Sequence, residues 1–395
     1  MSRKLLDKNF CVLPWTGFEL ETTGAVKNCI LSEQEIGDIH KNTIEDVLHS
    51  KENQKIKSQM LAKQFPTSCN GCYHLEKNRA TNFDSISSRL YYAKEIGLSV
   101  TDKLLSDDNA FDLRHVDLRW NNKCNQACVY CGPQNSSKWA QEVKSSNIRL
   151  ANEYIFEPQV DQKNVEKVKQ YVFKNIKKLK NVYLAGGEPM LMNDNKELLA
   201  LLLEHNPNVH IRVNTNLSST RTGVFQLLCK FKNVQWTVSV DAIGNEYEYI
   251  RHHGLWKNFI KNLQHIQTLD HKINFNMLYF ILNYKSIFES VDYFKSMGFH
   301  DNSFVIGPII GPYHLDVNHL PAKVKQEVIE MFKERIGKNT GFFLQNSMEN
   351  CLKHLTQTDF HANIDVVRYN LQKLDKRRNL NSREIFPKLY KEVLQ

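Results

Sequence analysis

From about residue 111 onward, short apolar runs alternate with longer segments whose apolar residues recur at helical spacing. Six runs have the length and composition of strands, at residues 116–120, 182–185, 210–214, 234–240, 273–280 and 303–307. Helical segments such as ELLALLLEH and SIFESVDYFKSM lie between them. This alternation predicts an α/β fold in which parallel strands are joined by right-handed helical crossovers. Six strand–helix units fit an open, partial barrel or a doubly wound sheet equally well.

The segments on either side of this alternation have a different character. Residues 1–95 form a separate compositional unit with four cysteines, and after about Pro312 the strand pattern gives way to polar, helical sequence. A chain of 395 residues is long enough for two or three such parts. We therefore expect an N-terminal cysteine-rich α+β module (1–95), the α/β domain (110–312) and a helical C-terminal extension (313–395).

The formal charge of +9 does not change this picture. Much of the excess lysine lies on a predicted amphipathic helix at 164–180, where a solvated outer face accounts for it. Zinc-finger spacing, a recognition helix and a basic tail are all missing, so we expect no nucleic-acid partner. The N-terminal sequence has no apolar run of signal-peptide length, and no window has the length of a membrane span. We expect a cytoplasmic protein without a membrane partner.

Polar residues follow four successive predicted strands. They are residues 121–131 after the first, Gly186 to Pro189 after the second, Asn214 and Asn216 at the third, and Ser239 and Asp241 at the fourth. In parallel α/β folds, ligands bind at the carboxyl ends of the strands. The sequence thus predicts a ligand site at this end of the sheet.

The chain has nine cysteines, and an odd number in a reducing compartment does not favour a disulfide framework. Cys229 and Cys351 lie in apolar helical contexts, and we expect both to be buried small hydrophobes. The other seven fall into two groups.

The first group is the segment CNQACVYC, with cysteines at 124, 128 and 131. A structural zinc ion takes four protein ligands, so three thiolates need a borrowed histidine to hold one. A 4Fe–4S cluster also takes four ligands. Three cysteines therefore suit a cluster in which one iron is left for a ligand that is not part of the protein.

CNQACVYC, followed by LAGGEP at 184–189, resembles the radical S-adenosylmethionine (radical SAM) superfamily. The resemblance implies a partial (β/α)6 barrel and a 4Fe–4S cluster on Cys124, Cys128 and Cys131. It also implies a reducing electron donor of the flavodoxin or ferredoxin type. In that family the open iron binds S-adenosylmethionine, and one electron cleaves it to methionine and a 5′-deoxyadenosyl radical, which takes a hydrogen atom from the substrate.

The resemblance also implies which residues bind S-adenosylmethionine. The aromatic residue before the last cysteine lies by the adenine, the GGEP segment engages the methionine amino group, and the third strand supplies polar side chains. The S-x-D segment lies near the ribose and carboxylate, and the arginine of EYIRHHG pairs with the carboxylate. On this chain the set is Tyr130, Gly186, Gly187, Glu188, Pro189, Asn214, Asn216, Ser239, Asp241 and Arg251. The alternatives are a surface carboxylate for Glu188 and ordinary strand-end residues for Asn216, Ser239 and Arg251.

The second group comprises Cys11, Cys29, Cys69 and Cys72. The first two bracket a predicted β-hairpin with its turn at Thr23-Gly24, and the last two form a C-x-G-C knuckle. Four cysteines complete either a zinc site or a second 4Fe–4S cluster, and spacing alone does not choose. The segment resembles the SPASM module, or its shorter form Twitch, which implies a second cluster. In relatives this module usually follows the barrel, whereas here it precedes it.

Relatives with such modules act on peptides, on proteins, or on small molecules such as carbohydrate alcohols and nucleotides. We expect oxidative modification of a peptide, with the second cluster anchoring the substrate or accepting an electron. A small-molecule radical dehydrogenase or rearrangement enzyme is the alternative. A further alternative is a non-catalytic iron–sulfur protein. Loss of a loop cysteine or of the GGEP segment would favour that alternative, but the three loop cysteines and GGEP are all present.

Overall fold

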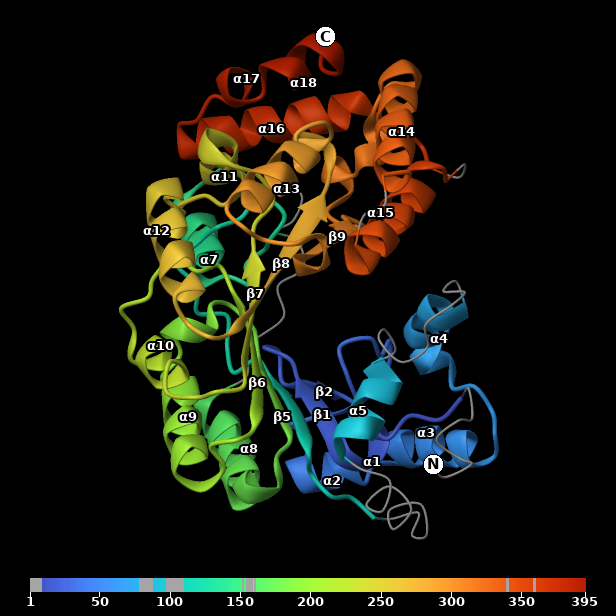
Figure 1. The fold of residues 1–395 in the computed structure, drawn as a ribbon, viewed down its shortest axis with the longest axis vertical. Helices are drawn as coiled ribbons and strands as arrows, with labels where there is room; N and C mark the ends of the chain where they lie inside the picture. The colour runs from blue at the N-terminus through green and yellow to red at the C-terminus, as the bar shows by residue number, and fades with distance from the viewer. Residues whose placement is uncertain are drawn as a thin grey trace. The chain divides into compact units, whose positions relative to one another are not determined.

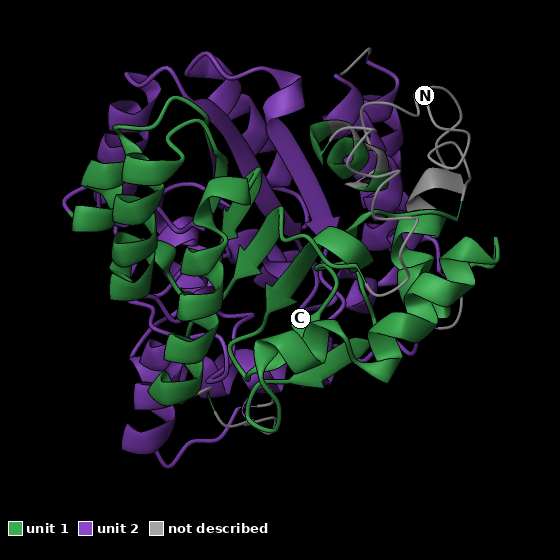
Figure 2. Cartoon of the chain, turned by 90° about the horizontal axis from the view of Figure 1, so that it is seen from below, with its two compact units in different colours: residues 1–122, 157–213, 222–234 green, residues 123–156, 214–221, 235–395 purple. Residues whose placement is uncertain are grey.

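A computed structural model describes residues 9–77, 88–96, 110–150, 153, 159, 161–338, 341–357 and 360–395 (Figure 1). The chain divides into two compact units, which Figure 2 shows in different colours. Unit 1 comprises residues 1–122, 157–213 and 222–234, and unit 2 comprises residues 123–156, 214–221 and 235–395. The expected parts 1–95, 110–312 and 313–395 are divisions along the sequence and stay a prediction.

The sheet of unit 1 has the strand order β3-β2-β1-β4-β5-β6. Its strands are β1 (Gly17–Leu20), β2 (Ala25–Lys27), β3 (Glu35–Asp38), β4 (His115–Leu118), β5 (Asn181–Leu184) and β6 (His210–Thr215), which runs into unit 2 at residue 214. Strands β1 and β2 are antiparallel around a turn in which Gly24 has φ +93°, which confirms the predicted hairpin. Strand β1 pairs in parallel with β4, so the cysteine-rich segment and the first α/β strand share one sheet.

Unit 2 contains the parallel strands β7 (Val234–Ser239), β8 (Lys272–Tyr279) and β9 (Phe304–Pro308), in that order. All six strands predicted from the apolar runs are present, and their ends agree to within two residues. Buried residues alternate with half-buried ones along β6 and β7. This alternation places residues such as Val213 and Trp236 on one face of a strand and polar residues on the other. The predicted α/β class is confirmed.

The helices between the strands were also predicted from periodicity, except the one at Gly244–Ile250. They are α8 (Gln162–Lys174), α9 (Asn193–His205) and α10 (Gly223–Leu228) in unit 1, and α11 (Gly244–Ile250), α12 (Trp256–Gln267) and α13 (Ile287–Ser296) in unit 2. Helix α8 buries Val165, Val168 and Val172 while most of its lysines face outward, which confirms its amphipathic character. It ends earlier than predicted, because the Asn175 side chain donates a hydrogen bond to the Tyr171 carbonyl and the chain continues as a 3-10 turn.

The remaining helices lie in the N-terminal segment, after the first cysteine group and in the C-terminal extension. They are α1 (Leu13–Thr16), α2 (Ile44–Leu48), α3 (Lys51–Leu61), α4 (Asn70–Lys77), α5 (Ser88–Ile96), α7 (Ser137–Ser145), α14 (Ala322–Ile336), α15 (Phe342–Leu355), α16 (Ile364–Arg378), α17 (Ser382–Ile385) and α18 (Pro387–Glu392). The described part of the extension is helical, as predicted (Figure 1). Within the described residues, no helix has the length and apolar character needed to cross a bilayer.

Two isolated cysteines were expected to be buried. Cys351 is fully buried on α15, as predicted. The expectation for Cys229 is wrong, because this residue is half-buried. Helix α10 ends at Leu228, so Cys229 is its C-terminal cap rather than part of its apolar face.

Candidate functional site

The loop with the first three cysteines lies in unit 2, and its backbone is held by residues at and just after the end of α11. The Ala127 amide donates to the His252 carbonyl at 3.0 Å, and the Val129 amide donates to the Ile250 carbonyl at 2.8 Å. These two bonds fix the middle of the loop, where Cys128 stands between the two donors.

Helix α7 holds the same loop at two further points. The Ser137 hydroxyl accepts from the Cys124 amide and donates to the Cys124 carbonyl, both at 3.1 Å. The indole nitrogen of Trp139 donates to the Cys128 carbonyl at 2.7 Å, and this side chain is fully buried. Sequence reasoning missed both residues. The Ser-Ser pair before a helical segment is an N-cap signal, but nothing in the sequence links it to the cysteines.

The three thiols affect one another electrostatically. A hydrogen bond from Cys131, together with the nearby Arg251 guanidinium, lowers the pKa of Cys128 to about 7 despite its burial. The pKa of Cys131 is raised well above its usual value by the same hydrogen bond, by burial and by the charges of Cys128 and Cys124. Three adjacent thiols, of which one is readily deprotonated, fit the donor set of an iron–sulfur cluster with one open iron.

A buried ion pair lies beside this loop. The Arg251 guanidinium pairs with Asp241 Oδ2 at 2.9 Å, and the Tyr130 hydroxyl donates to the same oxygen at 2.7 Å. Asp241 Oδ1 accepts from the Leu278 amide at 2.8 Å. Arg251 also donates to Cys128 Sγ at 3.9 Å. The structure thus brings three expected site residues together, and the partner of Arg251 is a carboxylate of the chain itself.

The polar residues around β6 and β7 form two smaller groups. The Ser239 hydroxyl donates to Asn214 Oδ1 at 3.3 Å. The Asn216 amide donates to Asn125 Oδ1 at 3.1 Å and approaches Cys124 Sγ at 3.8 Å. Asn125 lies inside the cysteine motif at a position that the resemblance does not assign. It links Cys124 to the end of β6.

The GGEP segment belongs to unit 1 and follows β5. Gly186 has φ +103°, and a Cβ atom there would lie 3.0 Å from the Asn121 carbonyl oxygen, so this position requires glycine. The Gly187 amide donates to the same oxygen at 3.2 Å. Glu188 is 1% exposed and accepts from the Met190 amide at 3.2 Å, and Pro189 begins a 3-10 turn. The alternative of a surface carboxylate at Glu188 is therefore wrong.

The second cysteine group lies in unit 1, where the fold gathers residues up to 61 positions apart in the sequence. Burial and the charges of Cys29, Cys69 and Cys72 raise the pKa of Cys11 well above its usual value. Burial, Cys72 and Cys69 raise the pKa of Cys29 to about 12. Thiols that are buried together in this way need a bound cation to become thiolates at the same time. This donor set fits an iron–sulfur cluster, and by chemistry alone it also fits zinc.

Comparison with known proteins shows two families. Residues 118–294 match the radical SAM superfamily, and residues 11–73 match the iron–sulfur cluster-binding domain called SPASM. The chain therefore contains a radical SAM domain, the domain of a superfamily of enzymes, preceded by a SPASM-type module. The partial barrel expected for this class agrees with the parallel α/β strands found in each unit. The radical SAM match implies a 4Fe–4S cluster with S-adenosylmethionine as cofactors, and the SPASM match implies further iron–sulfur at the module.

Individual relatives are distant. GTP 3′,8-cyclase of Sulfurimonas denitrificans is 24% identical over 182 residues, which cover 45% of this chain and 50% of that protein. SuiB of Streptococcus suis, solved with its precursor peptide SuiA, is 14% identical with a TM-score of 0.40 over 74% of this chain and 65% of that one. The enzyme anSMEcpe with bound AdoMet is 15% identical with a TM-score of 0.40 over 56% and 61%. The chain thus spans about half the length of the curated relative it matches.

Proposed function

We propose that this chain cleaves S-adenosylmethionine reductively and uses the resulting radical to take a hydrogen atom from a substrate. The observation that carries the proposal is the group of three neighbouring thiols at 124, 128 and 131, beside the Arg251–Asp241 ion pair and inside a radical SAM domain. When bound there, a 4Fe–4S cluster supplies the single electron that splits the sulfonium into methionine and a 5′-deoxyadenosyl radical.

The surrounding residues have separate parts in this proposal. Cys124, Cys128 and Cys131 bind the cluster, and the Arg251 guanidinium favours the thiolate at Cys128, with which it is in contact. Asp241 fixes Arg251 and Tyr130 in place. The GGEP segment, with Asn214, Asn216 and Ser239, binds S-adenosylmethionine. Glu188 is already buried and desolvated, which strengthens its attraction for the cosubstrate's ammonium group.

The finer proposal is oxidative modification of a peptide. Loss of one hydrogen atom leaves a substrate radical, and an oxidised product requires the loss of one further electron and one proton. Cys11, Cys29, Cys69 and Cys72 would hold a redox-active cluster that accepts this electron, and the proton goes to solvent or a nearby base. Zinc has no accessible redox state and cannot take the electron. An external flavodoxin- or ferredoxin-like donor reduces the first site.

A small-molecule substrate is the second candidate. The observation that favours it is the match to a protein named as a GTP cyclase, whose substrate is a nucleotide by that name. Cyclisation is a rearrangement and does not require the second site to accept an electron. The two candidates therefore differ in whether the module must be redox-active.

The first experiment measures 5′-deoxyadenosine after anaerobic reconstitution and dithionite reduction. We expect it to accumulate even without substrate, and its absence from a fully reconstituted sample would contradict the proposal. Candidate peptides and nucleotides deuterated at exchange-inert positions are then compared, because only the true substrate transfers deuterium into 5′-deoxyadenosine. A peptide product lighter by two hydrogen atoms supports oxidation, and deuterium transfer from nucleotides alone refutes the peptide proposal.

Metal analysis of the same sample tests the second site. Two clusters predict about eight irons per chain, by the four-iron stoichiometry of each. About four irons with one zinc would remove the electron-acceptor role of the module and leave the chemistry of the first site intact.

A further inference from the structure

Helix α16, in the C-terminal extension, ends with two arginines whose side chains are almost completely buried. The Arg377 and Arg378 side chains are 2% and 1% exposed. A buried guanidinium group is costly unless it is paired. Arg378 donates to Glu142 Oε2 through Nε at 3.2 Å and Nη2 at 3.1 Å, and Arg377 pairs with Glu153. Because Glu142 lies on α7, the extension is tied to the helix that follows the cysteine loop.

Both guanidinium groups also lie over the indole ring of Trp139, at 4.7 Å for Arg378 and 5.4 Å for Arg377. Cation–π contacts are stronger when they are shielded from water, and Trp139 is fully buried. The other end of this side chain donates to the Cys128 carbonyl at 2.7 Å. A single indole therefore connects the arginines of α16 to a cysteine of the first site.

The same end of α16 reaches the second support of the loop. The Tyr249 hydroxyl on α11 donates to Asp375 Oδ1 at 2.8 Å. The carbonyls of Ile250 and His252, which accept from the loop amides, follow Tyr249 directly. Asp375 itself is held by the Ser382 amide and hydroxyl, at 2.9 and 2.5 Å. Both supports of the loop are thus braced by residues within one turn of α16.

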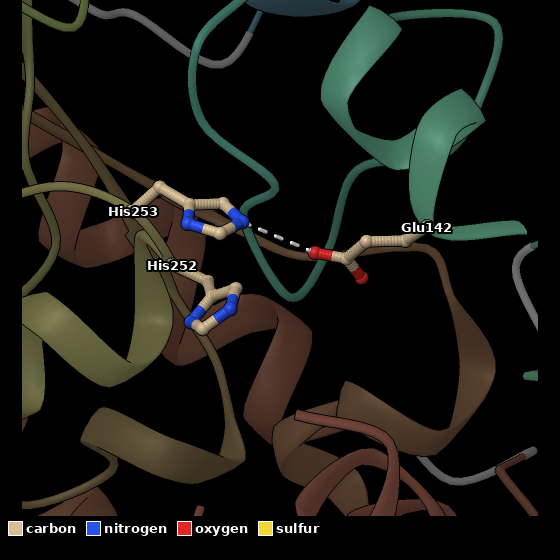
Figure 3. Close-up of side chains that lie close together, drawn as sticks. All are labelled: Glu142, His252 and His253. Atoms are coloured by element: carbon tan, nitrogen blue, oxygen red, sulfur yellow. Dashed lines mark ion pairs between the residues drawn. The ribbon is translucent and has the colours of Figure 1, made fainter. Parts of the chain in front are cut away.

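A metal site is the competing interpretation of this region. Glu142, His252 and His253 have donor atoms within 4.8 Å of one another, and Figure 3 shows the Glu142 carboxylate directed toward His253. However, Glu142 Oε2 already neutralises Arg378 and lies 3.6 Å from Arg377 Nε. Burial and the nearby positive charge of Arg378 lower the pKa of His252 to about 3. A dication here would lie beside the positive charges of Arg377 and Arg378, and Glu142 already accepts from Arg378 through Oε2, so we assign Glu142 to the arginines.

We infer that Asp375, Arg377 and Arg378, here called the α16 clamp, are positioning residues that hold the cysteine loop through Trp139 and Tyr249. The inference rests on the proposed function, because the loop is the proposed binding site of the first cluster. The contacts of the clamp are with Glu142, Glu153, Trp139 and Tyr249, so it acts on the loop through these residues. It gives the C-terminal extension a part in the radical SAM site.

The test compares Arg378→Gln with Lys376→Gln, which removes the same charge from an exposed lysine on the same turn of the helix. Three properties of the full chain are measured: the iron content, the change of the reduced EPR signal on adding S-adenosylmethionine, and the KM for this cosubstrate when 5′-deoxyadenosine is the product assayed. Only the first site binds the cosubstrate, so the EPR change reports on this site alone. We expect an altered EPR change and a KM raised about five-fold for Arg378→Gln, the loss equivalent to one net hydrogen bond. Lys376→Gln should match the wild type.

Trp139→Phe keeps a buried aromatic ring but removes the donor to the Cys128 carbonyl and part of the indole under the arginines, so it tests the same connection if Arg378→Gln does not fold. We expect the same altered EPR change and the same rise in KM. If both variants show the EPR change and the KM of the wild type, the inference is overturned. If Arg378→Gln does not fold, wild-type EPR and KM in Trp139→Phe alone would also overturn it. Failure of the wild-type chain itself to form 5′-deoxyadenosine would instead overturn the proposed function.

Discussion

Replacing Asp241 by asparagine tests how much the buried ion pair beside the cysteine loop contributes to the stability of the fold. Asp241 is fully buried and uses both carboxylate oxygens, one for the Leu278 amide and one for Arg251 and Tyr130. Asparagine can keep the bond from Leu278, but its amide NH₂ then faces the Arg251 guanidinium, which can only donate, and it cannot accept the bond from the Tyr130 hydroxyl. The substitution leaves the Arg251 charge buried and uncompensated.

The expected cost follows from this loss of charge compensation. Removing one partner of a buried ion pair typically costs about 3–5 kcal/mol. With a urea slope of roughly 3 kcal/mol per molar, the unfolding midpoint should fall by about 1–1.7 M. Urea unfolding of the cluster-free chain measures this directly and separates folding from metal binding. Asp270→Asn is the matched control, because Asp270 is exposed and should change stability by no more than about 0.5 kcal/mol.

A double variant makes the reasoning refutable. Arg251→Met removes the buried charge that Asp241→Asn strands, so the pair of substitutions should destabilise the chain less than the sum of the single ones, by about 1–3 kcal/mol. A midpoint for Asp241→Asn within error of the wild type, or strictly additive single effects, would show that the ion pair contributes little and that Arg251 is held in another way.

Three further predictions concern other parts of the chain. Gly186→Ala should destabilise the chain more than Gly298→Ala in thermal unfolding, because both positions have positive φ but only at Gly186 would the new Cβ meet a backbone oxygen; equal effects would contradict this. The unfolded chain protonates His115 near pH 6.5, whereas burial lowers its pKa in the folded state to about 3, so the free energy of unfolding should fall as the pH is lowered. Between pH 7 and pH 5, His115 should account for about 2 kcal/mol of this fall. The variant His115→Phe should therefore lose about 2 kcal/mol less stability over this range than the wild type, whereas the exposed control His205→Gln should behave like the wild type. Anaerobic reconstitution of a triple alanine variant should lose about four irons per chain, and unchanged iron would refute the assignment of the first cluster to its three residues, Cys124, Cys128 and Cys131.

Local sequence signals predicted the strands, the hairpin around Gly24 and the two cysteine groups, because each depends on periodicity or on spacing over a few residues. Helix ends were less predictable. The apolar run around Cys229 reads as continuous helix, but α10 stops at Leu228 and leaves the thiol half-buried. Local hydrogen bonds to capping residues decide such ends, and periodicity does not contain them.

The site showed the same division between local and long-range information. The sequence indicated Cys128 and Arg251 as site residues, but not that Arg251 pairs with Asp241 or that Trp139 donates to the Cys128 carbonyl. Arg378, which lies over Trp139, is 239 positions further along the chain. Contacts at such separations depend on the tertiary fold, and neither residue has a motif that marks it. The ligands of a site are therefore easier to find in a sequence than the residues that hold those ligands in place.

The cysteine-rich module precedes the barrel strands in the sequence, but it shares a sheet with them. In unit 1, β1 of the module pairs in parallel with β4, with Glu19 opposite Asp117. Arg119 joins the two carboxylates, at 2.6 Å from Glu19 and 3.2 Å from Asp117. Burial raises the pKa of Glu19 to about 7 and that of Asp117 to about 6, so this network would be costly to form unless the two strands were fixed side by side. Glu19 also contributes to raising the pKa of Cys29, which places a thiol of the module within electrostatic reach of the same network. Because β4 is the strand from which the chain enters the first cysteine loop, the module is joined to the radical SAM domain through the sheet itself, and its position before the barrel in the sequence does not separate the two.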